Sequence, residues 1–533
     1  MTAGVRQERR HALRALPVSW PRLPTLLTVL AIVAGVAYRL GLLLSDTPQT
    51  NSDEATMGLA ALHIAQGRDF PVWFYGQRYM GTLEAYLAAP VFALAGPSTV
   101  GLRLPTLALY AIFLMLAWRL ALRLTADRWF GLLVVVVLAL GSDRVVKNQL
   151  IAGGGYPEMN AAGMALAVLA YDLATGRPGR RLPRWLGWGL LAGLLLWVDP
   201  LVLPYVAGIG AVLVAYRWRE LRGRAGALLG LGALVGAAPL LGDALAAGRN
   251  PLDAVLAAAG SGQSAGWADR LHGALVLGPP LGMGFCSPGR CAGWQLWWAL
   301  ALPVLLLVAG LAARRALRVS PTPTAPAPPV RAALSLALVG AAVATLAVYA
   351  GSSASGRTPI ESSRYLSCLL ISVPVLLWPL WDAARRRPAE PGRAATVRLV
   401  AAGVLVAVLG TGAVATAGAI ATAPAARAEQ ARHDALVAAL RERGVRHLYG
   451  GYWTCNRLTL ASGEDVVCAV VDDDLSPGHD RYRPYRTTVG SSPGAVWLAR
   501  SGSPLHDRLR TDPRFHEALT LPDWHAYLPS ANP

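Results

Sequence analysis

Charged side chains are scarce in this chain of 533 residues, where Asp, Glu, Lys and Arg make up 15% of the sequence. In soluble domains about a quarter of the residues are charged. Hydrophobic residues make up 54%. So little charge argues against an ordinary soluble multidomain protein, and so much apolar side chain excludes a disordered or collagen-like one. The composition predicts a polytopic membrane protein.

Lysine is almost absent, since Lys147 is the one lysine among 49 basic residues. The net charge of +18 is carried by arginines that gather in short clusters between apolar runs. This distribution follows membrane topology and does not form a basic face for nucleic acid, so we expect no nucleic-acid partner. The phosphate-binding GxxxxGKS/T motif is also missing, which argues against a soluble nucleotide-sugar donor.

Apolar runs of about 20 residues can cross the hydrocarbon core of a bilayer, and the chain has about eleven candidates. They are 23–44, 102–124, 130–141, 156–173, 185–198, 201–216, 225–245, 294–313, 332–350, 365–381 and 397–421. Every second connection is rich in arginine, which is the positive-inside pattern; Arg144 and Lys147 are a minor exception on the outside. We therefore expect a multi-pass protein of the plasma membrane, with a cytoplasmic N-terminus and an outer C-terminus.

Three parts follow from this topology: a cytoplasmic tail at 1–22, a transmembrane domain at 23–423 and an extracytoplasmic α/β domain at 424–533. The first outer loop, 45–101, contains a pattern for an amphipathic interfacial helix at 53–66 and an apolar segment at 82–95 that is too short to span. Residues 320–329 read as a Pro/Ala linker. In the C-terminal part we expect a polar helix at 425–443 and strands at 466–471 and 495–498.

Four of the five cysteines fall in outer segments. Cys286 and Cys291 share one loop, and Cys455 and Cys468 share the C-terminal part, whereas Cys368 lies in a span. Two outer pairs fit disulfides in an oxidising compartment, with free buried thiols as the alternative. Zinc fits less well, because CSPGRC has neither ligand spacing nor a nearby second pair.

Acidic residues also gather in predicted outer segments. They are Asp53 and Glu54 after the first span, Glu84 in TLEAYLAAP, Glu158 after three glycines, and Asp199 in a turn between spans. A carboxylate in apolar surroundings is costly without a partner or a function. The alternative role of Asp53 and Glu54 is to stabilise the N-terminus of a helix by complementing its dipole. The alternative role of Asp199 is to cap a helix before a proline.

One arginine departs from the positive-inside bias, because Arg364 in ESSRYL enters a late span from the outside, with Arg357 in the same loop. A helical bundle would bring this arginine and the acidic sites together at its outer end. Together they indicate a polar site there more strongly than any one of them does.

Two segments of the N-terminal part carry a family resemblance. SDEATMGLAALHIAQG and YGQRYMGTLEAYLAAPVFALAGPSTVGLRLP resemble the GT-C superfamily of polytopic glycosyltransferases, in the branch of the protein O-mannosyltransferases and the lipid A aminoarabinose transferases. Members have acidic residues in the first outer loop, a re-entrant helix, an ARLP-like entry to the next span (here 102–105) and an outer Arg-Tyr (here Arg364 and Tyr365). The resemblance covers about the first 220 residues well. It departs at 79–84, where YMGTLE replaces a His-Pro-Pro or Glu-Lys-Pro-Pro pattern.

The resemblance implies an inverting transfer of a sugar from a polyprenyl-phosphate donor to an acceptor hydroxyl on the outer face. The acceptor would be a glycan, lipid or protein of the cell envelope. Asp53 would act as the base, with Glu54 orienting it or binding the acceptor. Arg364 would bind the donor phosphate through its fork of N–H groups, together with Tyr365 and Arg357.

The remaining polar residues would bind substrate. Glu84, Glu158 and Asp199 would hold sugar hydroxyls, or else a divalent cation; no cofactor is otherwise expected. Tyr75 and Tyr79 offer ring faces to the sugar or the isoprenoid, with interfacial anchoring as the alternative.

Two other functions stay open. A secondary transporter of a lipid or sugar would show internal repeats and charges at the membrane midplane, and neither is evident in the sequence. A ligase or phosphotransferase that uses the same lipid carriers is the other alternative.

Overall fold

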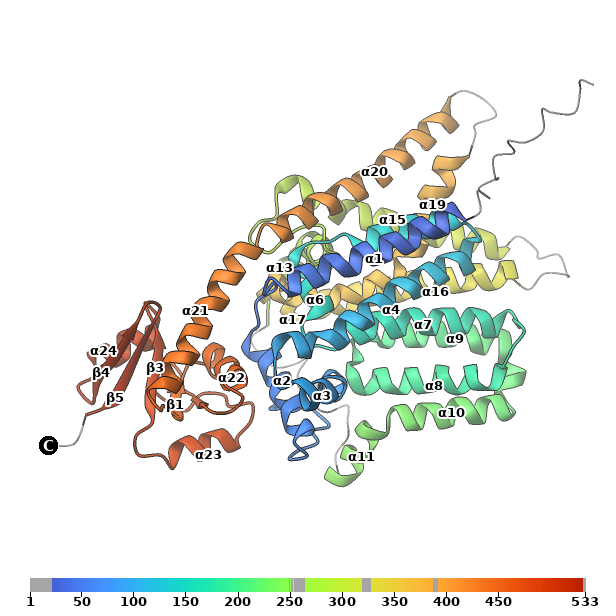
Figure 1. Cartoon of the computed structure of the whole chain (residues 1–533). Helices are drawn as coiled ribbons and strands as arrows, with labels where there is room; N and C mark the ends of the chain where they lie inside the picture. Colours follow the sequence, from blue (N-terminus) through green and yellow to red (C-terminus); the bar gives the residue numbers. More distant parts are fainter. Residues whose placement is uncertain are drawn as a thin grey trace, which may run out of the picture.

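The computed structural model describes residues 22–248, 250, 253, 264–318, 327–386 and 392–530. It shows a bundle of helices with a smaller part at the C-terminus that contains a five-stranded sheet (Figure 1). Nearly all of the predicted N-terminal tail, and most of the predicted 320–329 linker, lie outside the described residues.

The helices of the bundle follow the predicted apolar runs closely. In chain order they are α1 (Leu23–Leu43), α2 (Ser52–Ala65), α3 (Leu83–Ala95), α4 (Thr99–Thr125), α5 (Arg128–Ala139), α6 (Asp143–Leu150), α7 (Tyr156–Ala174), α8 (Arg181–Val198), η1 (Pro200–Val202), α9 (Leu203–Leu221), α10 (Arg224–Gly236), α11 (Ala238–Ala247), α13 (Trp267–Leu271), η2 (His272–Leu277), α14 (Gly278–Gly282), η3 (Gly293–Leu296), α15 (Trp297–Arg318), α16 (Ala327–Gly351), α17 (Ser353–Arg357), α18 (Pro359–Ser362), η4 (Ser363–Ser372), α19 (Val373–Arg385) and α20 (Arg393–Ile420).

The chain is a multi-pass membrane protein. In the described part, seven helical segments are long and apolar enough to cross a membrane, or nine if two bent pairs each form one span. The bent pairs are α5–α6 at 93° and α10–α11 at 62°. Helices α7 and α8 run beside the others in the bundle but are not among the seven (Figure 1). The expected number of eleven spans is therefore not confirmed.

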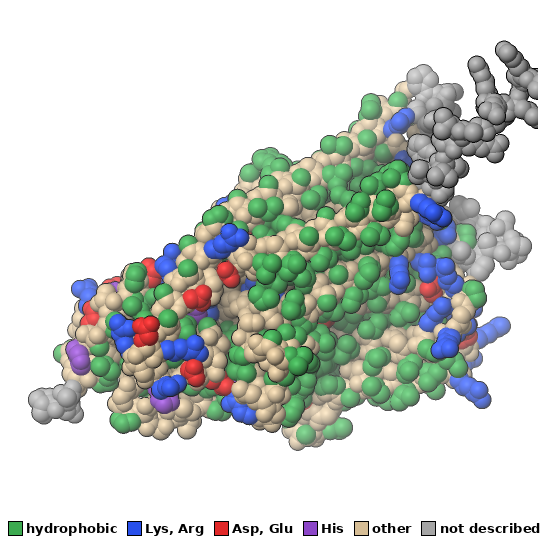
Figure 2. Space-filling model, viewed as in Figure 1, with side chains coloured by type: hydrophobic (Ala, Val, Ile, Leu, Met, Phe, Trp, Pro, Cys, Tyr) green, Lys and Arg blue, Asp and Glu red, His purple; other side chains and the backbone are tan. Residues whose placement is uncertain are grey.

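The surface of the bundle fits a bilayer. Figure 2 shows hydrophobic side chains along its flank, Lys and Arg at the end far from the C-terminal part, and mixed charges over the C-terminal part. Many large apolar side chains of the bundle helices are exposed, such as Leu300 at 78% and Leu399 at 72%. In water such a surface would be unfavourable, but lipid covers it without cost.

The predicted span 130–141 ends in a sharp break, and α6 follows where we expected a loop. Gly141 has φ 153°, and a Cβ there would come within 2.3 Å of the Val145 side chain, so the bend requires glycine. Arg39, fully buried in α1, donates to the Ala139 carbonyl at 2.6 Å and to Gln149 Oε1 of α6 at 2.9 and 2.8 Å. The arginine thus satisfies a carbonyl that the break removes from the helical ladder.

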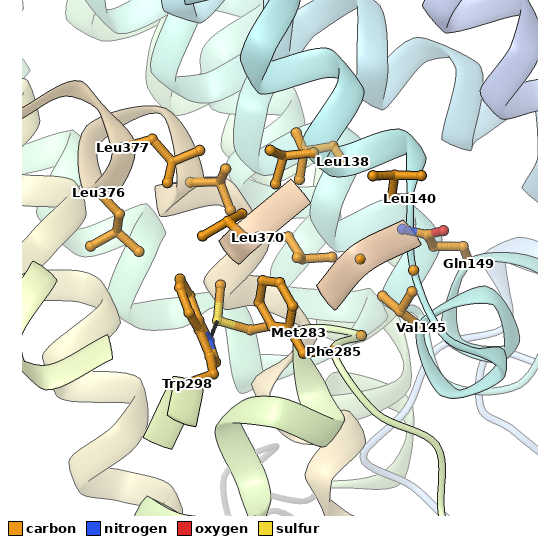
Figure 3. Close-up of a pocket in the computed structure, with 16 residues that line it drawn as sticks. Leu138, Leu140, Val145, Gln149, Met283, Phe285, Trp298, Leu370, Leu376 and Leu377 are labelled. Carbon is orange, nitrogen blue, oxygen red and sulfur yellow. Dashed lines mark hydrogen bonds between the residues drawn. The ribbon is translucent and has the colours of Figure 1, made fainter. Parts of the chain in front are cut away.

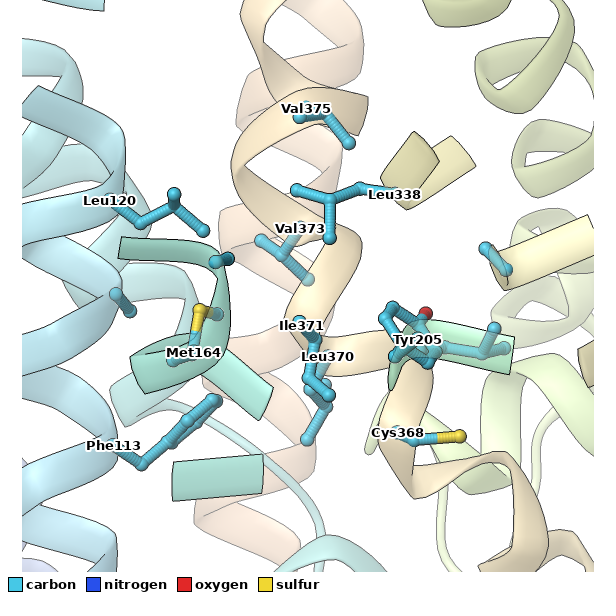
Figure 4. Packing of buried hydrophobic residues seen from close by; sticks show 14 of the residues in the cluster. Phe113, Leu120, Met164, Tyr205, Leu338, Cys368, Leu370, Ile371, Val373 and Val375 are labelled. Carbon is cyan, nitrogen blue, oxygen red and sulfur yellow. The ribbon is translucent and has the colours of Figure 1, made fainter. Parts of the chain in front are cut away.

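A second irregular segment lies at the centre of the bundle. The predicted helix 365–381 begins as the 3₁₀-helix η4, which packs with α7, α9 and α16 (Figure 4). The Tyr205 hydroxyl lies 2.9 Å from Ser372 Oγ, which donates to the Leu338 carbonyl at 2.9 Å. Runs of 3₁₀-helix longer than 3–4 residues are uncommon, so this packing holds η4 in an unusual form. Arg364 is its second residue.

Helix α2 does not have the amphipathic exposure that its sequence pattern predicts. Nearly all of its side chains are buried, on every face of the helix. It packs against α3 on one side and against α22 (Tyr452–Ala461) of the C-terminal part on the other. The exposed face that we expected is covered by a segment about 400 residues away in the chain.

The C-terminal part contains the predicted helix as α21 (Ala423–Glu442) and a sheet in the order β2-β1-β3-β5-β4. The strands are β1 (His447–Gly450), β2 (Val467–Val470), β3 (Val496–Arg500), β4 (Phe515–Leu521) and β5 (Trp524–Pro529). β1 pairs in parallel with β2 and β3, and β5 pairs antiparallel with β3 and β4. Helices α23 (Pro484–Gly490) and α24 (Pro504–Thr511) complete it. The expected small sheet is confirmed, and α22 begins just after the carboxyl end of β1.

Candidate active site

A polar cavity of about 510 Å³ lies between the bundle and the C-terminal part. Its walls come from the chain after α1, the start of α2, α6, α18, η4, α21 and α22. They are Thr47, Pro48, Gln49, Asn51, Asp53, Asp143, Arg144, Lys147, Pro288, Ile360, Glu361, Arg364, Thr422, Ala425, Ala426 and Trp453. Two of the predicted site residues, Asp53 and Arg364, thus share one cavity although they are distant in the sequence.

Other hollows fit the chemistry less well. The one beside the α5–α6 break has a volume of about 20 Å³ and is lined mostly by apolar side chains such as Leu138, Phe285 and Leu370 (Figure 3). That is room for about one water molecule. Another, of about 530 Å³, lies between α9 and α16 and is lined almost entirely by small and apolar residues. The cavity at Asp53 is therefore the candidate active site.

Asp53 lies in the first turn of α2 and its side chain is 26% exposed. Asn51 caps the helix, because its Oδ1 accepts from the Glu54 backbone N–H at 2.9 Å. Asp53 Oδ1 accepts a hydrogen bond from the Tyr452 hydroxyl and another from Arg481 Nη2 at 3.1 Å. In the described part of the chain, no hydrogen bond is made to Oδ2. One oxygen of this carboxylate is held, and the other is available to a substrate.

Three cations line the same cavity. Arg144 and Lys147 come from α6, and Arg364 comes from the start of η4. The Nε atoms of both arginines are buried, and neither has a hydrogen-bond partner among the residues described. Asp143 and Glu361 are the other acids on the wall, and Asp143 is 3.3 Å from Arg290. Together with Asp53 the wall carries three acids and three cations, and the two unpartnered Nε–H donors can serve an anionic group such as a phosphate.

A set of buried carboxyls lies outside the lining of the cavity. Glu84 Oε2 accepts from the Gly153 N–H at 2.6 Å, and its Oε1 accepts from Gly155 at 3.3 Å. Glu158 lies beside Glu84, is 3% exposed, and has no hydrogen bond to either oxygen from the described residues. A buried carboxyl without partners is costly, which marks this position for a function.

Asp199 and Tyr79 complete this region. Asp199 is buried and accepts from the Leu201 N–H at 2.8 Å, so it does cap η1 as the alternative reading holds. Burial raises the pKa of Tyr79, and the charges of Arg481, Arg364 and Asp199 all act on its hydroxyl. The Tyr79 hydroxyl therefore lies in the electrostatic field of the buried Asp199 and of the two arginines.

Glu54 occupies a different environment from its neighbour. It is fully buried, and its two oxygens accept from Arg103 Nε and Nη2, both at 2.6 Å. Arg103 belongs to the GLRLP segment and is also fully buried. This bidentate pair joins α2 to α4, and Glu54 does not line the cavity. The geometry favours a structural role over direct contact with an acceptor.

Two further predicted residues lie away from the cavity. The Tyr75 hydroxyl donates to Asp69 Oδ2 at 2.8 Å and lies 2.8 Å from His63 Nδ1, in a cluster between the first outer loop and the C-terminal part. Arg357 is exposed at the end of α17. Neither lines the cavity, and Tyr365 does not line it either, although it follows Arg364 directly, with the guanidinium 5.5 Å from its ring centre.

The cysteines are paired in the structure as Cys286–Cys291 and Cys455–Cys468, each with Cα atoms 5.0 Å apart. Cys368 is buried as a free thiol in η4. Both pairs lie in segments that the predicted topology places outside.

The donor set does not fit a metal site. Throughout the described ranges, no three His, Cys, Asp or Glu side chains come together as ligands for an ion. A divalent cation would have to rely on Asp53 with substrate oxygens or on the buried acid pair. No step proposed below involves one.

Four candidate residues at this site were not among the predicted site residues: Arg144, Lys147, Tyr452 and Arg481. For Arg144 and Lys147 a signal was present, because they were the exception to the positive-inside pattern. For Tyr452 and Arg481 the sequence offers no such signal, since their partner Asp53 is about 400 residues away.

Comparison with known proteins concerns the fold. No protein-family model and no curated protein sequence matches this chain. The crystal structure of ArnT from Cupriavidus metallidurans bound to undecaprenyl phosphate is similar, with a TM-score of 0.56 and 14% identity over 96% of this chain and 98% of that one. The apo state of that protein has a TM-score of 0.54 and 15% identity, over 95% of this chain and 98% of that one. The apo oligosaccharyltransferase of Archaeoglobus fulgidus has a TM-score of 0.52 and 11% identity, over 90% of this chain and 70% of that one. The expected fold is therefore confirmed.

Proposed function

Because the chain has the fold of the GT-C superfamily of glycosyltransferases, we propose that it transfers a sugar from a polyprenyl-phosphate donor to an acceptor hydroxyl on the outer face of the membrane. The observation that carries this proposal is the cavity that Asp53 shares with Arg364, Arg144 and Lys147, alongside the further acids Asp143 and Glu361. The structure of ArnT with undecaprenyl phosphate supports a lipid-phosphate carrier for this fold.

The cations bind and stabilise the leaving phosphate. Arg364 presents two N–H groups in a planar fork to the donor phosphate, and Lys147 and Arg144 add charge on the same wall. As the bond between the anomeric carbon and the phosphate oxygen breaks, its electron pair remains on the polyprenyl phosphate. Three cations on the wall of the cavity stabilise this developing charge.

Asp53 acts as the general base on the acceptor. Its Oδ2 removes the proton from the acceptor hydroxyl as that oxygen bonds to the anomeric carbon on the face opposite the phosphate. The products are the glycosylated acceptor, a protonated Asp53 and the free lipid phosphate. A single displacement of this kind inverts the anomeric centre.

The buried acids suit the sugar of the donor. Glu84 and Glu158 lie beside each other outside the cavity lining, and hydroxyl or amino groups of a donor sugar that reaches them would supply the hydrogen bonds that Glu158 lacks. The acceptor would enter beside Trp453, which is 65% exposed on the opposite wall. We infer a component of the cell envelope as acceptor, because the cavity lies at the end of the bundle predicted to be outside.

The test uses purified protein and labelled polyprenyl-phosphate sugars. Asp53→Asn keeps the size and the accepting oxygen but removes the base, so turnover should fall by about two to four orders of magnitude. Asp46→Asn is the matched control, since Asp46 is an acid of the same loop outside the cavity, and its φ of 56° suits asparagine. Turnover by Asp53→Asn within about threefold of wild type would contradict the proposal, because a lost general base costs far more.

A further inference from the structure

The partners of Asp53 come from the far end of the chain. The Tyr452 hydroxyl and Arg481 Nη2 both donate to Asp53 Oδ1, and both belong to the C-terminal part. The Ser52 hydroxyl donates to the Tyr452 backbone carbonyl. The first turn of α2 and the first turn of α22 therefore meet at the carboxylate.

The donors are themselves fixed. Arg481 Nε donates to the Tyr452 oxygen at 2.7 Å, and Nη1 donates to Gln77 Oε1 at 3.1 Å. The guanidinium lies 4.9 Å from the centre of the Phe74 ring. Burial, followed by the bond to Asp53, raises the pKa of Tyr452 to about 12, so this hydroxyl keeps its proton and acts as the donor. The network has one arrangement of donors and acceptors.

We propose that Tyr452 and Arg481 are positioning residues for the general base: they hold Asp53 Oδ1 so that Oδ2 faces the cavity and the acceptor. The C-terminal part would then complete the active site in addition to any part in choosing the acceptor. This inference rests on the proposed function, in which Asp53 is the base.

Simple docking of the C-terminal part does not require this arrangement. A separate cluster joins the same two surfaces, where His63 Nε2 lies 3.1 Å from Glu464 Oε1 and Tyr485 donates to that oxygen at 2.8 Å. Burial opposes ionisation of Glu464, but the bonds from His63, Tyr485 and Arg68 outweigh it and lower its pKa to about 2. The interface is held there without involving Asp53.

Two donors on one oxygen restrict rotation of the Asp53 carboxylate, so that Oδ2 keeps its direction toward the cavity. Removal of a donor should therefore lower kcat with little change in KM for the lipid donor. A contact that served docking alone would not separate the two constants in this way.

The experiment measures kinetics of the full-length protein with a labelled polyprenyl-phosphate sugar. Tyr452→Phe and Arg481→Gln should each lower kcat by up to about 100-fold, as expected for a displaced reacting group. KM for the lipid donor should change little, because the phosphate contacts remain. Arg481→Lys should restore part of the rate.

Tyr485→Phe is the matched control, because it removes a hydroxyl from the same interface at a distance from Asp53. It should leave kcat unchanged. Equal losses in Tyr452→Phe and Tyr485→Phe would overturn the inference, since they would reflect docking alone. Thermal unfolding of each variant shows whether the protein is folded; if Tyr452→Phe does not fold, Arg481→Lys carries the same comparison.

A double-mutant cycle separates this inference from the proposed function. If Tyr452 acts through Asp53, then Tyr452→Phe should cost nothing further in an Asp53→Asn background. An inactive Asp53→Asn together with a fully active Tyr452→Phe would overturn the positioning role and leave the proposed function intact. An active Asp53→Asn would overturn the proposed function first.

Discussion

Replacing Glu54 by glutamine should destabilise the protein without removing the base. Glu54 and Arg103 are both fully buried, and two hydrogen bonds of 2.6 Å join them. Glutamine keeps one accepting oxygen, so one of these bonds can persist, but the negative charge is lost. Arg103 keeps its bond to the Pro48 carbonyl at 2.8 Å and is left as a buried cation without a counter-charge.

The size of the effect follows from that geometry. A lost hydrogen bond to a charged group costs about 1.5–3 kcal/mol, and breaking a buried ion pair on one side costs about 3–5 kcal/mol in all. For a chain of 533 residues this corresponds to a fall of about 3–5 °C in the unfolding midpoint. The double variant Glu54→Leu/Arg103→Met should recover most of the loss, because an apolar pair of similar volume replaces the ion pair.

Thermal unfolding of the detergent-solubilised protein measures the loss, and turnover per folded molecule measures activity. Asp53→Asn serves as the neighbouring control, since its side chain is partly exposed and asparagine can still accept from Tyr452. It should show the reverse pattern, with stability kept and turnover lost. The reasoning would be refuted if Glu54→Gln kept the wild-type midpoint but lost turnover, because Glu54 would then act on the acceptor.

Arg364→Lys should raise KM for the lipid donor by roughly tenfold with an unchanged unfolding midpoint, because a point charge cannot reproduce bidentate phosphate binding; unaltered kinetics would remove its assigned role. Mass mapping of protein from the native membrane should find Cys455 bonded to Cys468, and two free thiols there would contradict the pairing. Glu464 has a pKa lowered from 4.5 to about 2, so its contribution to stability is present above pH 4.5 and is lost as the pH falls to about 2. The unfolding midpoints of wild type and Glu464→Gln should therefore differ above pH 4.5 and converge at low pH, and a constant difference would contradict this. A reporter fused after Gly463 should lie outside, and a cytoplasmic signal would contradict the predicted orientation.

The sequence by itself determined the class of the protein and much of its secondary structure. Apolar length and charge content are local properties, so the spans appear as runs that an individual helix must bury in lipid. The strands at β2 and β3 were visible for the same reason. The resemblance in the first outer loop and the entry of Arg364 into a late span drew attention to Asp53 and Arg364, two residues that the structure brings to one cavity.

Only the tertiary structure decided what each polar residue does. Asp53 and Glu54 are adjacent in sequence, yet successive residues of a helix point in different directions, so one faces the cavity and the other faces Arg103. The amphipathic pattern of α2 could not reveal that α22 covers its other face. The break before α6 depends on Arg39, and the arrangement of Asp53 depends on Tyr452 and Arg481. The contact of Arg39 with Ala139 and those of Asp53 with Tyr452 and Arg481 join residues 100 or more positions apart. A local pattern contains no information about such partners, because they meet only when the chain has folded.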